Sequence, residues 1–427
     1  MVEKILMNRE EAATTSIAES ATDSKHDFVT KLRQPSLLPR LLEYIKWQRA
    51  LRRAIALGET PEEAPEGLSP ISLNLDPTTA CGYDCTHCID LPILNAKIKF
   101  DHEKLLSSLG NLIERGLRSV ILIGGGEPTL YPKFKELVYF LKERGVQVAV
   151  VSNGSGNEDI LDCARYFSKG DWVRLSLDSG TNDTFIAMHR PKKKNISLEG
   201  ICAWVPLIRK ANPALPVAFS YIVTWEGAQE NGQKIISNID EIVLATKLAR
   251  NYGFSYIALK AFLTRHQNGA EVMDTKMIED FDLTVKRIQD AIDEAKTYET
   301  EDFKVVTSTN LGGLEAGNWK DLMNQPKTCH KQWLQQVLSP WGVYNCPAHR
   351  AVPKAKIGGK DAYAEASEIE TTKKSVVAIL SRFNAHKECA NTACPYNAMN
   401  WWIEKAINGE LDPADMEALV EHGDYYF

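Results

Sequence analysis

The sequence has no long apolar run and no excess of positive charge. No hydrophobic stretch approaches the roughly 20 residues of a membrane-spanning helix, and the polar start, Met1–Ser24, lacks the apolar core of a signal peptide. The 50 Lys and Arg against 56 Asp and Glu give a net charge of -6, without the basic footprint of a nucleic-acid-binding protein. We therefore expect a cytoplasmic protein with no membrane and no nucleic-acid partner.

The size and composition are those of an ordinary globular protein. A chain of 427 residues is long enough for two or three domains, or for one large α/β domain with an appendage. Nine cysteines in a chain of cytoplasmic character indicate metal ligation or catalysis more than disulfides.

Three cysteines stand close together at Cys81, Cys85 and Cys88, separated by three and then two residues. Three thiolates on one loop can hold three corners of a four-iron, four-sulfur (4Fe-4S) cluster. The fourth iron then lacks a protein ligand, and an open position is typical of a catalytic metal site. The alternatives are a zinc knot or a cluster of reduced core cysteines. Zinc sites usually pair Cys-x2-Cys with a second such pair or with histidines, which this spacing fits poorly.

Short β-rich segments alternate with longer helical segments between residues 71 and 260. The expected strands are 71–76, 119–123, 147–152, 172–177, 217–223 and 255–260. The expected helices between them are 102–115, 133–144, 158–167, 198–211 and 232–252. This alternation predicts parallel βαβ units with the functional loops at the carboxyl ends of the strands. The fold class is therefore α/β, as an open barrel or a doubly wound sheet.

A glycine-rich turn, Gly124-Gly125-Gly126-Glu127-Pro128, ends the second expected strand. Successive glycines let the backbone approach a ligand and leave its amides and carbonyls free, and Glu127 adds an acceptor. Such a turn alone is usually only a turn. Its place about forty residues after the cysteine loop favours a ligand site.

Polar side chains end the next two expected strands. Ser152 and Asn153 follow the third strand, and Ser176 and Asp178 the fourth, where they are placed to hydrogen-bond a ribose and a carboxylate. Arg190 either binds that carboxylate through two N–H donors of its guanidinium or lies on the surface beside a run of lysines.

The cysteine loop and the Gly-Gly-Glu-Pro segment together resemble the radical S-adenosylmethionine (SAM) superfamily. An aromatic ring precedes the last cysteine in that family, and His87 takes this place. The resemblance implies a partial (β/α)6 TIM barrel, a 4Fe-4S cluster on the three cysteines, SAM at its open iron, and a flavodoxin- or ferredoxin-type reductant. It implies SAM contacts from His87, Gly125, Gly126, Glu127, Ser152, Asn153, Ser176, Asp178, Arg190 and Ile257.

Four more cysteines, Cys329, Cys346, Cys389 and Cys394, lie near the end of the chain. They are enough to close every iron of a second, auxiliary 4Fe-4S cluster, and a structural zinc site is the alternative. A hairpin is expected at 337–347 and a helix at 367–383. The arrangement resembles the twitch domain, a shortened SPASM extension. Its cysteine spacing departs from the usual pattern, so three histidines are candidate substitute ligands: His330, His349 and His386. Cys163 and Cys202 are expected to be buried apolar residues.

The expected organisation has four parts. Residues 1–27 form a frayed or disordered lead, and residues 28–70 a helix with a break near Pro35 and Pro39, followed by a linker. Residues 71–300 form the barrel, covered by a long helix at 271–298, and residues 301–427 the auxiliary-cluster domain.

The resemblance implies that SAM is cleaved reductively and that the resulting 5'-deoxyadenosyl radical takes a hydrogen atom from the substrate. A small polar metabolite is favoured: a sugar, aminocyclitol or nucleotide-linked sugar that undergoes dehydrogenation or elimination. The alternative is a peptide maturase. Maturases often carry a leader-binding domain and two auxiliary clusters, whereas this chain lacks a strand-rich start and has cysteines for one extra cluster. A non-catalytic metal protein would not need the glycine-rich turn.

Overall fold

The computed structural model describes residues 27–60, 62–266 and 269–427. The expected lead at 1–27 lies outside this part of the chain, except for its last residue. The main feature is a ten-stranded sheet with the order β11-β8-β5-β4-β3-β2-β1-β12-β13-β14. Its strands are β1 (Ser72–Leu75), β2 (Ser119–Leu122), β3 (Gln147–Ser152), β4 (Trp172–Ser176), β5 (Val217–Val223), β8 (Tyr256–Ala261), β11 (Lys304–Thr307), β12 (Gln335–Ser339), β13 (Gly342–Tyr344) and β14 (Lys356–Gly358).

The first six of these strands run parallel, in chain order, and confirm the six strands expected from the sequence to within one residue at each end. Two more parallel strands flank them: β11 beside β8 and β12 beside β1. Leu75 at the end of β1 pairs with both Leu122 and Leu338. The carboxyl ends of the parallel strands therefore meet at one edge of the sheet.

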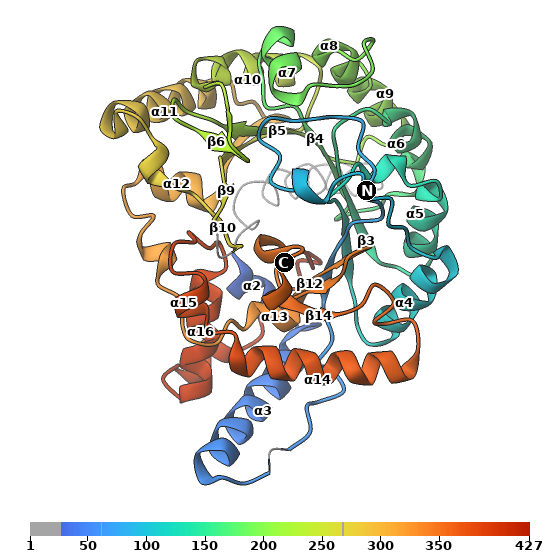
Figure 1. The fold of residues 1–427 in the computed structure, drawn as a ribbon, viewed down its shortest axis with the longest axis vertical. Coiled ribbons are helices and arrows are strands. Elements are labelled where there is room, and N and C mark those ends of the chain that lie inside the picture. Colours follow the sequence, from blue (N-terminus) through green and yellow to red (C-terminus); the bar gives the residue numbers. More distant parts are fainter. Residues whose placement is uncertain (1–26, 61, 267–268) are drawn as a thin grey trace, which may run out of the picture.

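Helices surround these strands in sequence order (Figure 1). They are α4 (His102–Glu114), α5 (Phe134–Glu143), α6 (Asn157–Cys163), α7 (Asn182–His189), α8 (Leu198–Cys202), α9 (Val205–Ala211), α10 (Ile242–Asn251), α11 (Phe281–Lys296) and α12 (Thr309–Glu315). Helix α4 shows why they form. Asp101 caps its amino end, and Leu105, Leu109 and Leu112 recur on one buried face.

Three of the expected helices were wrong in extent. The segment expected as a helix at 271–298 is helical only in α11, because β10 (Glu271–Val272) pairs with β9 (Thr264–Arg265) and a 3-10 turn follows at Thr275–Met277. The segment 198–211 is two helices, and Pro206 lies in the first turn of the second one. Because proline lacks an amide N–H, it starts a helix more readily than it continues one. The segment 232–252 is helical only in α10. Its first residues pair in a short antiparallel ladder, β6 (Gln229–Glu230) with β7 (Gln233–Lys234), and a 3-10 turn follows.

The amino-terminal part contains α2 (Phe28–Leu32) and α3 (Leu38–Leu57). The expected break lies at Pro35, whereas Pro39 sits in the first turn of α3. Leu41, Tyr44 and Trp47 form the buried face of α3. No helix within the described ranges is long and apolar enough to cross a bilayer.

The carboxyl-terminal part begins with the expected hairpin, formed by β12 and β13 in antiparallel pairing. Because β12 also pairs with β1, this part continues the main sheet. Its helices are α13 (Lys331–Leu334), α14 (Ala366–Arg382), α15 (Ala385–Glu388) and α16 (Asn397–Asn408), and α14 confirms the helix expected at 367–383. The domain boundary at residue 300 stays a prediction.

The last residues of the chain cross the amino ends of the strands. Ser119 at the start of β2 donates to the Tyr425 carbonyl over 2.7 Å, and Gln335 at the start of β12 donates to the Phe427 carbonyl. The side chains of Tyr426 and Phe427 are buried. This segment therefore closes the edge of the sheet opposite the strand ends that carry the expected site.

Removal of residues 425–427 is expected to lower the free energy of unfolding by about 3 to 6 kcal/mol. Two buried aromatic side chains contribute roughly 1.5 to 3 kcal/mol each, and the truncation also leaves Ser119 and Gln335 without these acceptors. Urea denaturation measures the change. Val420→Ala in the same segment, at a side chain that is 74% exposed, serves as the control. An unchanged midpoint in the truncated protein would show that the segment does not hold the sheet edge.

Candidate active site and second cysteine site

The expected site residues gather at the carboxyl edge of the sheet because successive parallel strands end there. The three-cysteine loop follows β1 and the glycine-rich turn follows β2. Asn153 follows β3 and Asp178 follows β4. The turn and the loop are joined directly, since the Glu127 amide donates to the Ala80 carbonyl over 2.8 Å.

The thiols of Cys81, Cys85 and Cys88 lie close enough to act on one another electrostatically. Burial raises the pKa of Cys88 to about 12, and the neighbouring Asp90 adds to the effect. Burial also raises the pKa of Cys81 and of Cys85. Ionised thiolates at this position therefore need a compensating cation, which the irons of a cluster provide.

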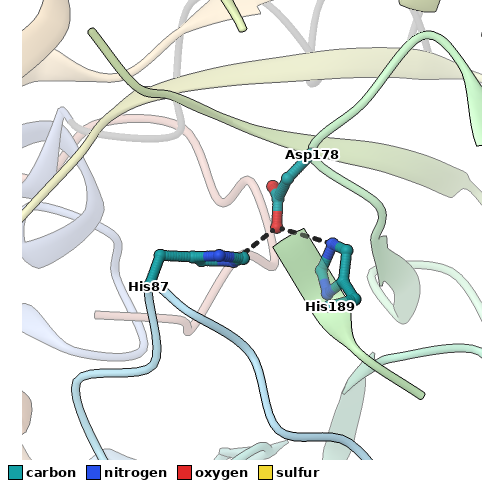
Figure 2. A group of neighbouring side chains, drawn as sticks. All are labelled: His87, Asp178 and His189. Carbon is teal, nitrogen blue, oxygen red and sulfur yellow. Dashed lines mark hydrogen bonds and ion pairs between the residues drawn. The ribbon is translucent and has the colours of Figure 1, made fainter. Parts of the chain in front are cut away.

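A buried carboxylate lies between two imidazole rings beside this loop (Figure 2). Asp178 Oδ2 is 3.2 Å from His87 Nε2 and 3.3 Å from His189 Nε2. Its other oxygen accepts the Ile222 amide N–H over 2.7 Å. Burial would raise the pKa of Asp178, but the hydrogen bonds from His189 and His87 hold it well below its usual range. Asp178 is therefore ionised and fixes both rings.

The two rings differ in what their second nitrogen faces. His189 Nδ1 lies 3.4 Å from the Cys85 sulfur, while His87 Nδ1 is buried and has no partner among the described residues. Burial lowers the pKa of His189, against the effect of Asp178. His189, which the sequence reasoning passed over, thus connects Asp178 to a cluster cysteine. Its position in α7, a helix that was not expected, explains the omission.

Glu127 holds the ends of β2 and β3 together. One carboxylate oxygen accepts three hydrogen bonds, from the Thr129 amide, the Thr129 hydroxyl and the Ser152 hydroxyl. The other accepts the Asn153 amide N–H over 2.7 Å. The four hydrogen bonds are unevenly shared: Oε1 accepts three and Oε2 accepts one, so the second lone pair of Oε2 can accept a hydrogen bond from a ligand.

The glycine turn is packed against the cysteine loop. A Cβ at Gly126 would lie 2.3 Å from the Thr78 carbonyl oxygen, and one at Gly125 would lie 2.9 Å from the Ile93 side chain. Glycine is therefore required at Gly126 by close backbone approach. Asn153 completes the contact from β3, since its side-chain amide lies 3.9 Å from the Cys81 sulfur.

The structure also places three further residues that the sequence predicts to contact SAM. Arg190 is exposed and donates to Gln233 over 2.8 Å. Ile257 lies within β8, where it pairs with Phe219 and Val305, and the carboxyl end of that strand is Ala261. Ser176 is the last residue of β4 and is half-buried. Contacts of these three residues with SAM stay predictions.

A buried ion-pair network that the sequence did not predict lies beside the glycine turn. Arg350, from the carboxyl-terminal part, is 2.9 Å from Asp76 at the end of β1 and 2.7 Å from Asp90. Arg265 joins Asp90 to Glu271 at 3.3 and 3.1 Å. Burial raises the pKa of Asp76 to about 7, against the effect of Arg350. The only signal in the sequence was Asp76 at the end of the first expected strand. Its partner Arg350 lies far along the chain, and residue spacing could not predict that pairing.

The other four cysteines, Cys329, Cys346, Cys389 and Cys394, line a single cavity. Their shared position was expected from the sequence. Three further side chains of this lining carry hydrogen-bond donors without a partner among the described residues: Lys331, His349 and Thr392. Orphaned donors beside four thiols fit an anionic, sulfur-rich group.

Among the described residues, neither cysteine set brings three sulfurs within 4.8 Å of one another. In the described ranges, the only three metal-binding side chains with donor atoms all within 4.8 Å of one another are His87, Asp178 and His189. A zinc ion binds thiolates at 2.3 Å, which puts tetrahedral sulfurs about 3.8 Å apart. Neither cysteine set is that compact.

Of the three histidines considered as substitute ligands, one lines the cavity. His330 has both nitrogens occupied, by Tyr44 at 2.8 Å and Glu404 at 2.9 Å. His386 faces the Gln325 carbonyl at 3.3 Å. His349 is buried in the cavity wall with both nitrogens free of partners in the described protein.

Residues 75–224 match the family model of the Radical SAM superfamily. They form a radical SAM domain. The match contains the cysteine loop, the glycine turn, Asn153 and Asp178. It therefore confirms the resemblance for this part of the chain, identifies the protein as an enzyme, and implies a 4Fe-4S cluster and SAM as its cofactors.

Two curated relatives share one printed name, S-adenosylmethionine-dependent nucleotide dehydratase. The protein from Selenomonas ruminantium is 28% identical over 257 residues, which are 55% of this chain and 89% of that relative. The protein from the Thermoplasmatales archaeon (strain ISO4-H5) is 36% identical over 109 residues, or 25% of this chain and 38% of that relative.

Among solved structures, Streptococcus suis SuiB is similar with a TM-score of 0.50 and 14% sequence identity. The likeness covers 71% of this chain and 66% of SuiB. At this identity it supports a shared fold alone. The chain thus has a mixed α/β architecture with a large parallel sheet.

Gly126→Ala is expected to reduce SAM cleavage on the order of a hundredfold, because the new Cβ pushes the glycine turn away from the Thr78 carbonyl and the cysteine loop. The assay measures 5'-deoxyadenosine after reduction of anaerobically reconstituted protein. Gly312→Ala is the control, since a Cβ there meets nothing within 4 Å, and it should keep full cleavage. Wild-type cleavage by Gly126→Ala would remove the steric argument for this turn.

Proposed function

We propose that this enzyme binds a 4Fe-4S cluster through Cys81, Cys85 and Cys88, cleaves SAM, and removes a hydrogen atom from a nucleotide or nucleotide-linked sugar. When bound, the cluster and SAM supply a 5'-deoxyadenosyl radical. One observation carries the proposal: the loop of three half-buried cysteines lies directly against a glycine turn that could not accept a Cβ. The superfamily's partial (β/α)6 barrel is the proposed form of the parallel sheet.

The enzyme's own residues orient SAM and exclude water. The remaining acceptor position on Glu127 and the carbonyls of Gly125 and Gly126 are suited to an amino group. His87 Nδ1, buried and without a partner in the described residues, is suited to a second polar group of the ligand. Because Glu127 and Asp178 are already held by protein donors, binding requires little rearrangement of the site.

The substrate class is supported by the relatives, two of which are named as nucleotide dehydratases. We therefore propose elimination of water from the sugar. The hydrogen atom taken from the substrate stays on 5'-deoxyadenosine, so the substrate radical must gain one electron and one proton as it loses water. A one-electron carrier besides the catalytic cluster would meet this need.

The four-cysteine cavity is the proposed site of that carrier, held in a twitch-like region by Cys329, Cys346, Cys389 and Cys394. A 4Fe-4S cluster there, when bound, would supply one electron for elimination or accept one for dehydrogenation. Dehydrogenation is the second candidate, since four protein ligands leave no iron open for substrate. The flavodoxin- or ferredoxin-type reductant stays a prediction.

Reconstituted enzyme, SAM and dithionite should be incubated with nucleotides and nucleotide-linked sugars that carry deuterium on the sugar. Transfer of deuterium into 5'-deoxyadenosine identifies the substrate, and the product mass distinguishes loss of water from loss of two hydrogens. Peptides test the maturase alternative in the same assay. Deuterium transfer from a peptide, and from no nucleotide, would overturn the proposal.

Cys85→Ala and Cys346→Ala should separate the two cysteine sites. Cys85→Ala is expected to abolish SAM cleavage, because it removes a ligand of the catalytic cluster. Cys346→Ala is expected to keep SAM cleavage without product, because the electron carrier is lost. The measurement compares 5'-deoxyadenosine with product for each variant, and Cys202→Ala, at a cysteine outside both sites, is the control. Full product formation by Cys346→Ala would exclude a role for the second site in turnover.

A further inference from the structure

The four-cysteine cavity contains a buried lysine. Lys331 follows Cys329 by two residues and is only 1% exposed. Its ammonium nitrogen has no hydrogen-bond partner among the described residues and lies 5.3 Å from the centre of the Tyr396 ring, which also lines the cavity. A buried charge is unfavourable unless an opposite charge compensates it, so this position indicates an anionic group in the cavity.

The local fold gives Lys331 little freedom to leave this position. Asn400 on α16 accepts the backbone N–H groups of both His330 and Lys331, at 2.9 and 3.1 Å. The same Asn400 side chain directs its amide toward the Cys329 sulfur at 3.7 Å. The backbone of Lys331 is therefore fixed beside Cys329, the first of the four cysteines.

The charge acts on the cysteines themselves. Burial raises the pKa of Cys329 to about 11, and Lys331 opposes that rise, as it does at Cys394. Lys354 acts in the same direction at Cys389, but its ammonium is already paired with the Glu388 carboxylate. Lys331 is therefore the positive charge in the cavity wall that has no carboxylate partner among the described residues.

The catalytic loop has surroundings of the opposite sign. Glu127 acts to raise the pKa of Cys81, Asp178 that of Cys85, and Asp90 that of Cys88. Arg350 and Lys192 oppose them only in part. Since reduction of a cluster adds one negative charge, nearby cations favour the reduced form and nearby anions disfavour it.

We propose that the Lys331 ammonium sets the reduction potential of the second cluster and raises it. A higher reduction potential favours the reduced form of the second cluster, so one electron stays available for the substrate radical. The inference rests on the proposed second cluster and deepens its role. In this proposal Lys331 contacts neither substrate nor SAM and acts only through the second cluster.

The test is a redox titration of the second cluster followed by electron paramagnetic resonance. A Cys81→Ala, Cys85→Ala, Cys88→Ala background of the full chain removes the catalytic cluster, so that one signal remains. Lys331→Met keeps the length of the side chain and removes its charge, and its midpoint potential should shift to a more negative value. Lys331→Arg keeps the charge and should retain the original potential.

His349→Leu is the matched control, because it removes another orphaned donor from the same cavity wall without removing a permanent charge. Its shift should be smaller than that of Lys331→Met. An unchanged potential in Lys331→Met, with about four irons retained per chain, would overturn the role of the lysine and leave the cluster in place. An equal shift in both variants would also overturn it. Absence of iron from the background protein would instead refute the second cluster.

Discussion

Strand β1 is the element on which both cysteine sites depend. It is buried along its whole length and pairs with β2 on one side and β12 on the other. The first pairing places the catalytic loop beside the glycine turn, and the second attaches the segment that carries Cys329 and Cys346. Because both faces of β1 are buried, a slip of one residue in either ladder would exchange the side chains that the two faces pack, so the register is strongly specified. Backbone hydrogen bonds thus fix how the two sites are related.

Side chains add a second connection between the sites. Asp90 follows Cys88 by two residues, and Arg350 follows Cys346 by four; the two are joined at 2.7 Å. Arg350 also contacts Asp76, the residue after β1. Buried ion pairs contribute little net stability once their desolvation is counted, but a guanidinium held by two carboxylates fixes geometry. The network therefore serves the position of the two loops more than the stability of the fold.

The sequence predicted the features that depend on local pattern. Hydrophobic periodicity gave the six parallel strands and most helices, and residue spacing gave both cysteine sets. It failed mostly where the outcome depends on distant partners. One failure had a local cause: the helix expected at 232–252 begins in a short ladder around Asn231-Gly232, a hairpin signal that the sequence carried. Pairing of Arg350 with Asp76, the burial of Lys331 and the contact of His189 with Cys85 each join segments that are remote in sequence or depend on a helix that was missed.

The charge balance at the strand ends constrains how a nucleotide-linked substrate could lie. Two cations of this region, the buried Arg350 and the half-buried Arg265, already pair with three carboxylates: Asp76, Asp90 and Glu271. Phosphate groups placed among them would have to compete with these carboxylates for the same donors. The sugar, which is nearly neutral, faces no such competition. For the proposed substrate class, we therefore expect the sugar to face the cysteine loop and the phosphates to lie away from this network.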